Sequence, residues 1–151
     1  MVELKLALQQ ARKQFMFAAV QWVAMRNNLF TYRNLPKGAN WTIGNKTLYI
    51  KWENQSEKGF TELIENQMRA SLSVWATTAH SIFCDIYKNE PYQDTDEERR
   101  AVRCIVYMYR CAFAHNPIQP RWNVSNTNYD GIFEVPSIGY VLSTRGLDGK
   151  P

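Results

Sequence analysis

Apolar residues recur at steps of three and four along three segments of the chain. This spacing places them on one face of an α-helix, so it predicts helices over about 2–29, 60–88 and 95–115. Such faces are buried by packing against one another, and the sequence therefore predicts a mainly α-helical bundle. In chain order the three faces consist of Leu4, Leu8, Ala11, Phe15, Ala18, Trp22, Met25 and Leu29; Ile64, Met68, Leu72, Trp75, Ala79, Ile82 and Ile86; and Val102, Ile105, Tyr109 and Ala112.

Proline, glycine and capping residues mark the ends of these helices. The run Leu35-Pro36-Lys37-Gly38 interrupts the first pattern, because proline and glycine both disfavour a continuing helix. Thr95, followed three positions later by Glu98, fits a capping box at the start of the third helix. Asn116 precedes Pro117, and a residue before proline avoids the helical backbone, so we expect the third helix to end there.

Two further regions alternate apolar and polar residues, as β-strands do. Residues 41–52 alternate on both sides of the turn-forming pair Gly44-Asn45 and predict a small β-hairpin. The tail over 121–151 is rich in Gly, Asn, Pro and β-prone residues. In this extended C-terminal segment we expect 131–135 and 140–142 to form short strands or extended arms.

Composition indicates a single folded domain over 1–151. With 45% hydrophobic and 21% charged residues, the chain can bury a core. Its most apolar runs, 15–25 and 104–114, are about half of the roughly 20 residues that cross a bilayer, so we expect no membrane span. No secretory signal is visible at the N-terminus, and we expect a cytoplasmic location. The final Gly149-Lys150-Pro151 leads us to expect that the natural protein continues.

The cysteines argue against disulfides and metal binding. There are three, Cys84, Cys104 and Cys111, and no C-x-x-C occurs. Cys104 and Cys111 would lie about 10.5 Å apart along a helix axis, too far for a disulfide or for sharing a zinc ion. We therefore expect three buried thiols, with no metal and no cofactor.

Arg110 is the residue that most suggests chemistry, because it is the only charged residue between Cys104 and Ala114. A guanidinium in such an apolar run needs an anion, and its planar fork suits a carboxylate or a phosphate. His115, five residues later, can carry a proton at neutral pH. On a straight helix the two lie about 140° apart, so a symmetric second copy could bring its own pair across the gap.

The segment Met108–Pro117, which contains Arg110 and His115, resembles the signature of the HEPN superfamily. In that signature an Arg is followed after four to six residues by a His, at the C-terminal end of a helix. HEPN domains are all-helical bundles that usually dimerise, and many are metal-independent endoribonucleases of toxin–antitoxin, CRISPR and other defence systems. The resemblance implies a HEPN-like homodimer that cleaves RNA as a toxin or defence effector, with an antitoxin or other regulatory protein as a further partner.

The resemblance also implies roles for individual residues. Arg110 would bind the scissile phosphate, while His115 would act as general base or acid on the 2′-hydroxyl or the leaving oxygen. Cleavage by the RNA's own hydroxyl should leave a 2′,3′-cyclic phosphate and should spare DNA. Asn116, Tyr109 and Arg103 are the residues expected to support this site.

Two positions depart from the family pattern. Many members carry Asn or another polar residue directly after the Arg, where this chain has Cys111, and Asn116 is the residue available to serve instead. Members silenced by a nucleotidyltransferase-type antitoxin often carry a Tyr two residues after the His. This chain has Pro117 there, so we do not expect modification at that position.

A different interpretation gives Arg110 and His115 structural roles. Arg110 would form a buried ion pair with a carboxylate of the second helix, such as Glu62 or Glu65, and His115 would cap its helix. The protein would then be a non-catalytic dimeric helical module that binds a protein partner or a nucleotide. His80, on the second helix, is interpreted as a hydrogen-bonded, half-buried residue.

The charge around the third helix and the apolar surface of that helix indicate which partners the protein could bind. From Arg99 to Arg121 there are five arginines and no acidic residue, which could attract a phosphate backbone or could form an ordinary solvated face. The apolar surface of the third helix is too wide for two neighbouring helices to cover. We therefore expect a dimer whose interface includes residues around 106–117.

Overall fold

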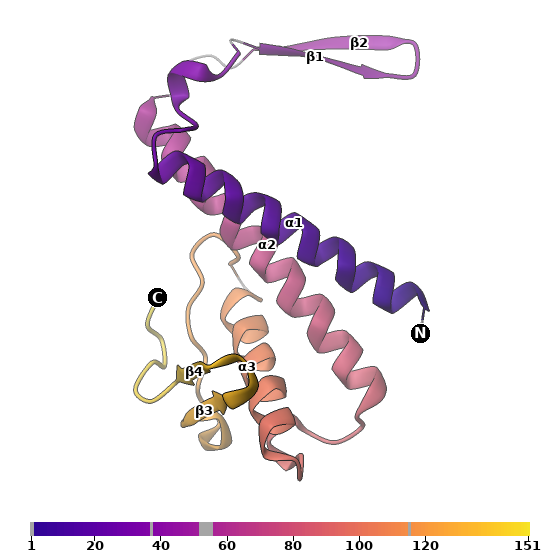
Figure 1. The fold of residues 1–151 in the computed structure, drawn as a ribbon, viewed down its shortest axis with the longest axis vertical. Helices are drawn as coiled ribbons and strands as arrows, with labels where there is room; N and C mark the ends of the chain where they lie inside the picture. The colour runs from indigo at the N-terminus through magenta and orange to yellow at the C-terminus, as the bar shows by residue number, and fades with distance from the viewer. Residues whose placement is uncertain (1, 37, 52–55, 115) are drawn as a thin grey trace.

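The computed structural model describes residues 2–36, 38–51, 56–114 and 116–151 (Figure 1). Over these ranges three α-helices pack together, and two small antiparallel hairpins accompany them. This confirms the mainly helical fold with a hairpin and short C-terminal strands. The helices are α1 (Val2–Arg26), α2 (Glu57–Ile86) and α3 (Glu97–Phe113), and the strands are β1 (Gly38–Ile43), β2 (Lys46–Lys51), β3 (Ile132–Val135) and β4 (Tyr140–Ser143).

Helices α1 and α2 run antiparallel, side by side, along most of their length (Figure 1). Small residues at the contact allow the two backbones to approach: Ala11 and Ala18 of α1 are buried, as is Ala76 of α2. Phe15 stacks on Trp75 with 5.2 Å between ring centroids. These residues belong to the predicted apolar faces, except that Ala76 follows Trp75 by one position.

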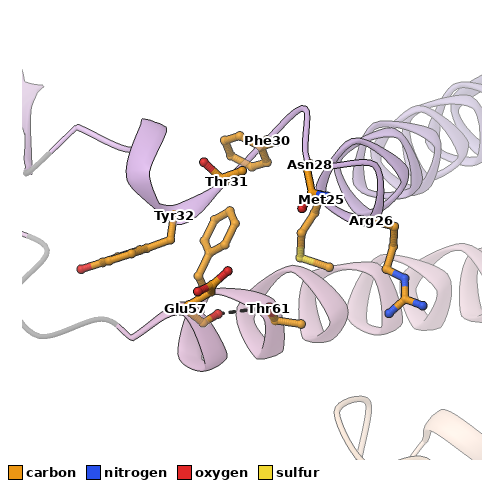
Figure 2. Close-up of a pocket in the computed structure, with 9 residues that line it drawn as sticks. Met25, Arg26, Asn28, Phe30, Thr31, Tyr32, Glu57 and Thr61 are labelled. Atoms are coloured by element: carbon orange, nitrogen blue, oxygen red, sulfur yellow. Dashed lines mark hydrogen bonds between the residues drawn. The ribbon is translucent and has the colours of Figure 1, made fainter.

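Helix α1 ends three residues before the predicted limit, because Asn28 adopts a left-handed backbone with φ of 58°. The Leu29 N–H donates to the Ala24 carbonyl at 2.8 Å, and the Asn28 N–H donates to that of Met25 at 3.0 Å. This pair of bonds is the Schellman arrangement that closes helix C-termini. Figure 2 shows Phe30 and Tyr32, just beyond this end, beside the start of α2.

The starts of α2 and α3 are set by side chains that sequence analysis did not select. The Ser56 hydroxyl accepts a hydrogen bond from the Gly59 N–H, so α2 begins at Glu57, three residues before the predicted limit. At α3 the Asp96 carboxylate accepts from the Arg99 N–H at 2.8 Å. The predicted capping box at Thr95 is therefore wrong, and Glu98 instead accepts from the Ser137 N–H at 3.0 Å.

Helix α3 and the C-terminal segment share the most completely buried part of the described chain. Cys104 and Met108 have no exposed surface, and they pack with Val124 and Tyr129 of the tail. A second cluster joins Ala101 and Ile105 to Val135 of β3. The tail therefore covers one side of α3, as Figure 1 shows for β3 and β4.

Backbone and side-chain hydrogen bonds fasten this tail. The Trp122 N–H donates to the Lys150 carbonyl at 2.9 Å, and the Gly149 N–H donates to that of Trp122 at 2.9 Å. The Thr144 hydroxyl, fully buried, donates to the Tyr129 carbonyl. These bonds join the segment that follows the candidate motif, at Trp122, to the end of the chain at Gly149 and Lys150.

The first hairpin projects from one end of the α1–α2 pair (Figure 1). Its pairing runs from Gly38 opposite Lys51 to Ile43 opposite Lys46, and Gly44 occupies the turn with φ of 59°. It therefore begins three residues before the predicted 41–52. Residue 52 lies outside the described residues.

Exposed apolar side chains concentrate on the outer side of α1 rather than on α3. Phe17 and Val20 each have an exposed fraction of 61%, and Met16 has 51%. On α3, Val102 and Val106 are half-buried and line an apolar cavity of about 580 Å³ together with residues of α1, α2 and the second hairpin. In the described part of the chain, no helix combines the length and the hydropathy needed to cross a membrane.

Candidate functional site

Arg110 lies on the last turn of α3 and is exposed. It forms no ion pair with any described residue, and its guanidinium approaches the Cys111 sulfur at 3.9 Å. The two carboxylates proposed as partners are engaged elsewhere: Glu62 with Lys58 and Glu65 with Arg69, each at 3.8 Å. The interpretation of Arg110 as a buried ion-pair residue is therefore wrong, because the side chain is at the surface.

The end of α3 lies directly beside the rest of the motif. Ala114 caps the helix, and its N–H donates to the Cys111 carbonyl at 3.3 Å. His115 lies outside the described residues. Asn116 is exposed, and its side-chain oxygen accepts from the N–H groups of Ile118 at 3.0 Å and Gln119 at 2.9 Å. The Asn116 side-chain oxygen therefore stabilises the turn after the helix, and its side-chain NH₂ group is left for other contacts.

One face of α3 carries Arg103, Tyr107 and Arg110 at helical spacing, and Tyr107 contacts α2 there. The Tyr107 ring lies 5.4 Å from the ring of His80, centroid to centroid, and stacks on Tyr129 at 4.4 Å. Burial, followed by the neighbouring Cys111 side chain, raises the pKa of Tyr107 to about 12. Tyr107 thus stays protonated at neutral pH and joins the Arg110 end of α3 to α2.

His80 is the second histidine of the chain, and the structure places it at this junction. Its Nε2 atom lies 3.4 Å from the Cys84 sulfur, one helical turn further along α2. Burial lowers the pKa of His80, and the positive charge of Arg110 lowers it next. The imidazole is consequently neutral at pH 7, with one nitrogen able to donate and the other able to accept.

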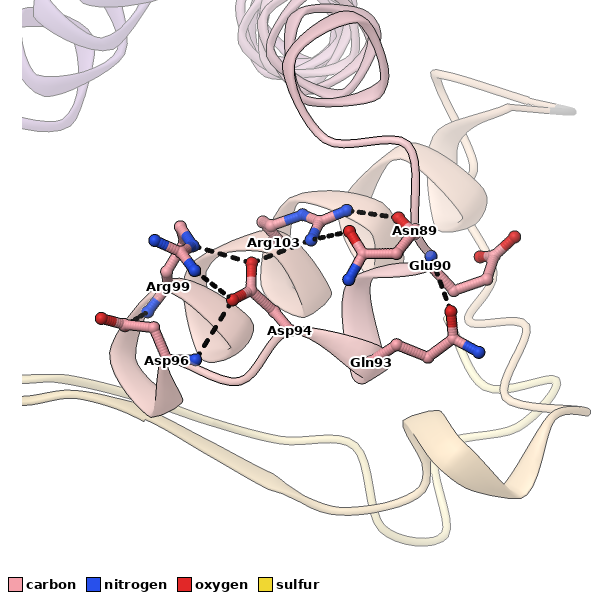
Figure 3. A network of polar contacts seen from close by, with 7 residues as sticks. All are labelled: Asn89, Glu90, Gln93, Asp94, Asp96, Arg99 and Arg103. Carbon is pink, nitrogen blue, oxygen red and sulfur yellow. Dashed lines mark hydrogen bonds and ion pairs between the residues drawn. The ribbon is translucent and has the colours of Figure 1, made fainter.

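Arg103, expected to support the site, is bound to two residues of the segment that leads into α3. Its side chain is only 2% exposed, and it donates to the Asp94 carboxylate at 2.8 Å and to the Asn89 backbone carbonyl at 2.6 Å (Figure 3). Arg99 binds the same carboxylate through two nitrogens, at 2.8 and 2.6 Å. These bonds hold the pKa of Asp94 well below its ordinary value, with Arg99 as the larger cause. The Arg103 charge is thus matched within the protein.

Tyr109, the residue before Arg110, makes its contacts with the C-terminal segment. Its hydroxyl forms a hydrogen bond of 2.7 Å with the Tyr140 hydroxyl of β4, and its ring contacts Trp122 at 5.5 Å between centroids. Burial, followed by the bond with Tyr140, raises the pKa of Tyr109. Its contacts attach α3 to the C-terminal segment, and its supporting role stays a prediction.

A polar pocket of about 280 Å³ opens between the end of α2 and α3. His80 and Tyr107 form one side of it, Tyr87 another, and Asn89 and Glu90 come from the loop that leads to α3. Sequence analysis missed this pocket, although the spacing of His80 and Cys84 by four residues was visible as two polar side chains on one helix face.

The three cysteines differ, which corrects the expectation of three buried thiols. Cys104 is buried, Cys111 is half-buried and Cys84 is exposed. Burial raises the pKa of Cys104 to about 11. Among the described residues, His, Cys, Asp and Glu side chains nowhere gather in a group of three or more able to hold a metal ion.

Comparison with known proteins identified no relative of this chain. The chain matches no protein-family model, no curated protein and no solved structure. The resemblance of its motif to the HEPN signature stays a prediction, and the argument for function depends on the residues described above.

Proposed function

We propose that this protein is a metal-independent endoribonuclease of the HEPN type, with Arg110 and His115 as its catalytic pair. The observation that carries the proposal is the position of Arg110. It is an exposed cation on the last turn of α3, unpaired among the described residues, and it precedes His115 by five positions in the sequence. An unpaired guanidinium at such a place is suited to bind a phosphate.

The reaction follows from the chemistry of the two side chains. Arg110 binds the non-bridging oxygens of the scissile phosphate and stabilises the charge that develops there. The RNA 2′-hydroxyl attacks phosphorus and loses its proton to a base, the bond to the 5′-oxygen breaks, and that oxygen takes a proton from an acid. His115 supplies the base or the acid. The products are a 2′,3′-cyclic phosphate and a free 5′-hydroxyl.

The proposal includes a homodimer that brings two Arg110–His115 pairs around one cleft. It also includes a role as a cytoplasmic toxin or defence effector, regulated by an antitoxin or another protein. The exposed apolar side of α1 supports association of some kind, because contiguous apolar surface is unusual on a monomer.

The rival function, a non-catalytic module, would have been favoured by an Arg110 buried against a carboxylate of its own chain. Because Arg110 is exposed, that support is gone. An apolar surface on α1 suits a protein-binding module as well as an enzyme, so cleavage itself is the discriminating measurement.

The experiment is an assay of purified protein on single-stranded RNA in the presence of EDTA. We expect cleavage with cyclic phosphate ends, no cleavage of DNA of the same sequence, and a loss of about 100-fold or more in Arg110→Ala and His115→Ala. Arg12→Ala removes the same charge from an exposed position of α1 and should retain full activity. Intact RNA, or equal activity in all variants, would overturn the proposal.

A further inference from the structure

The pocket between α2 and α3 has the size of a site for one ring system. Its volume of about 280 Å³ lies just below the roughly 300–1,000 Å³ of sites for drug-sized ligands. A double helix cannot enter it, whereas a single base turned out from an unpaired strand can. The size therefore favours a small planar group over a larger molecule.

Aromatic side chains line this pocket. Tyr107 and His80 meet at an interplanar angle of 59°, and Tyr87 carries the Arg103 guanidinium 4.7 Å from its ring centre. The rings are held in place, since Tyr107 stacks on Tyr129 and Arg103 is tied to Asp94 and Asn89. Tyr129 covers one face of Tyr107, and arginines lie over the Tyr87 ring. His80 and the remaining surface of Tyr107 are therefore the aromatic surface on which a nucleobase can stack.

The polar groups at the pocket can bind the edge of a base. The Asn89 side-chain oxygen accepts from Arg103 at 3.0 Å, which leaves its NH₂ group as a donor without a partner among the described residues (Figure 3). Glu90 is exposed beside it and offers a carboxylate acceptor. Neutral His80 adds one donor and one acceptor. Base edges also carry hydrogen-bond donors and acceptors side by side, so these groups can pair with them.

The pocket adjoins the proposed phosphate site. Tyr107 lines the pocket and precedes Arg110 by three residues on α3, so the two side chains lie on the same face of the helix. Cys111, whose sulfur lies 3.9 Å from the Arg110 guanidinium, follows Tyr107 by one helical turn. A strand whose phosphate binds Arg110 thus has a neighbouring base within reach of the pocket.

We infer that this pocket holds one unpaired nucleobase of the RNA strand, next to the phosphate that Arg110 binds. The inference rests on the proposed function for the identity of the strand. It assigns Tyr107 and His80 as the stacking surface, and Asn89 and Glu90 as the groups that contact the base edge.

The test uses Cys84, an exposed thiol that lines the same pocket. The probe is a single-stranded oligoribonucleotide with 2′-O-methyl groups, which can bind but cannot be cleaved through its own hydroxyl. Alkylation of Cys84 by iodoacetamide is followed by mass spectrometry. We expect saturating probe to slow alkylation about tenfold or more, and an abasic oligomer with the same phosphates to leave the rate unchanged.

A substitution separates the base edge from the folding of the pocket. Asn89→Asp keeps an oxygen for Arg103 and removes the NH₂ donor, so protection should need about tenfold more probe. Asn27→Asp makes the same change at an exposed site near the end of α1 and should bind as the wild type does. Equal protection by the abasic oligomer, or an unchanged Asn89→Asp variant, would overturn the inference.

The outcomes distinguish this inference from the proposed function. If RNA is cut while the probe leaves Cys84 unprotected, the pocket assignment is wrong and the ribonuclease stands. If Cys84 is protected but RNA stays intact, the pocket binds a base and the ribonuclease proposal fails. If neither occurs, both are wrong.

Discussion

The half of the molecule built on α3 and the C-terminal segment differs from the α1–α2 pair in how completely it buries its side chains. Met108, Cys104 and Thr144 have no exposed surface, and Arg103 has 2%. In the α1–α2 pair, Phe60 and Ile64 near the start of α2 are buried, whereas on α1 the residues with least exposure are alanines and Phe17 stays at the surface. The difference teaches that local apolar periodicity forms a helix, whereas complete burial needs contributions from segments distant in sequence.

The site lies where these two halves meet. Arg110 and Tyr107 come from the tightly packed half, and His80 and Cys84 come from α2. Helix α3 carries Arg110, the side chain proposed to bind phosphate, while α2 contributes the facing side of the neighbouring pocket. Activity and stability should therefore respond differently to substitutions in the two halves.

The largest effect on stability should come from Met108→Ala. Removing a fully buried methionine side chain leaves a cavity and should lower the free energy of unfolding by about 4 kcal/mol. Met16→Ala, at a position 51% exposed on α1, should cost about 1 kcal/mol or less. Urea unfolding followed by circular dichroism measures both. Equal losses would remove the contrast between the halves.

The next largest effect should come from Arg103→Met. The substitution keeps most of the buried stem but removes the bonds to Asp94 and Asn89. Because Arg99 still pairs with Asp94, we expect a loss of about 3 kcal/mol, the lower end for breaking a buried ion pair. Arg12→Met, on the exposed side of α1, should change stability by about 0.5 kcal/mol at most. Similar losses of unfolding free energy in Arg103→Met and Arg12→Met would show that the Asp94 network does not stabilise the fold.

Acid should weaken the same network. The folded pKa of Asp94 is depressed by Arg99 and Arg103, so its contribution is fully present above its unfolded pKa and is lost as pH falls through the folded value. The melting temperature should therefore fall as the pH is lowered from about 5 to about 2. Asp94→Asn should melt lower at pH 7 and show a smaller fall across that range. A parallel fall in both proteins would assign the acid sensitivity to other carboxyl groups.

The smallest effect on the whole molecule should come from Gly44→Ala. Alanine at a φ of 59° costs about 1–2 kcal/mol in the turn. Because the first hairpin projects away from the helices, that cost should speed amide hydrogen exchange in β1 and β2 and leave exchange in α3 unchanged. Faster exchange throughout would mean that the hairpin is coupled to the core.

The helices could be predicted because their signals are local, and their ends could not be predicted as well. Thr95 and Asp96 are adjacent and both suit a helix cap, but Asp94 is bound to Arg99 and Arg103, which places Asp96 at the first free N–H groups. Asn28 ended α1 early through a backbone conformation that an apolar pattern does not encode.

The candidate site shows the same division. Arg110 was identifiable because it is the only charged residue in an apolar run. Arg103 was expected to support the same site, because the sequence does not show which acidic residue it binds. Its pairing with Asp94 depends on how the loop after α2 returns to α3. The contact between His80 and Tyr107 joins residues 27 positions apart and depends on the crossing of two helices. Neither arrangement has a sequence period to reveal it.

The unequal access of the thiols has a kinetic consequence. A thiol reacts as the exposed thiolate, so Cys84 can be labelled in the folded protein. Cys104 is buried and has a raised pKa, so it reacts only when the structure around it opens. The labelling rate of Cys104 therefore reports how often the α3 half opens under native conditions. Compared with the rate of the same thiol in the unfolded chain, it gives the free energy of that opening without denaturant and without any RNA.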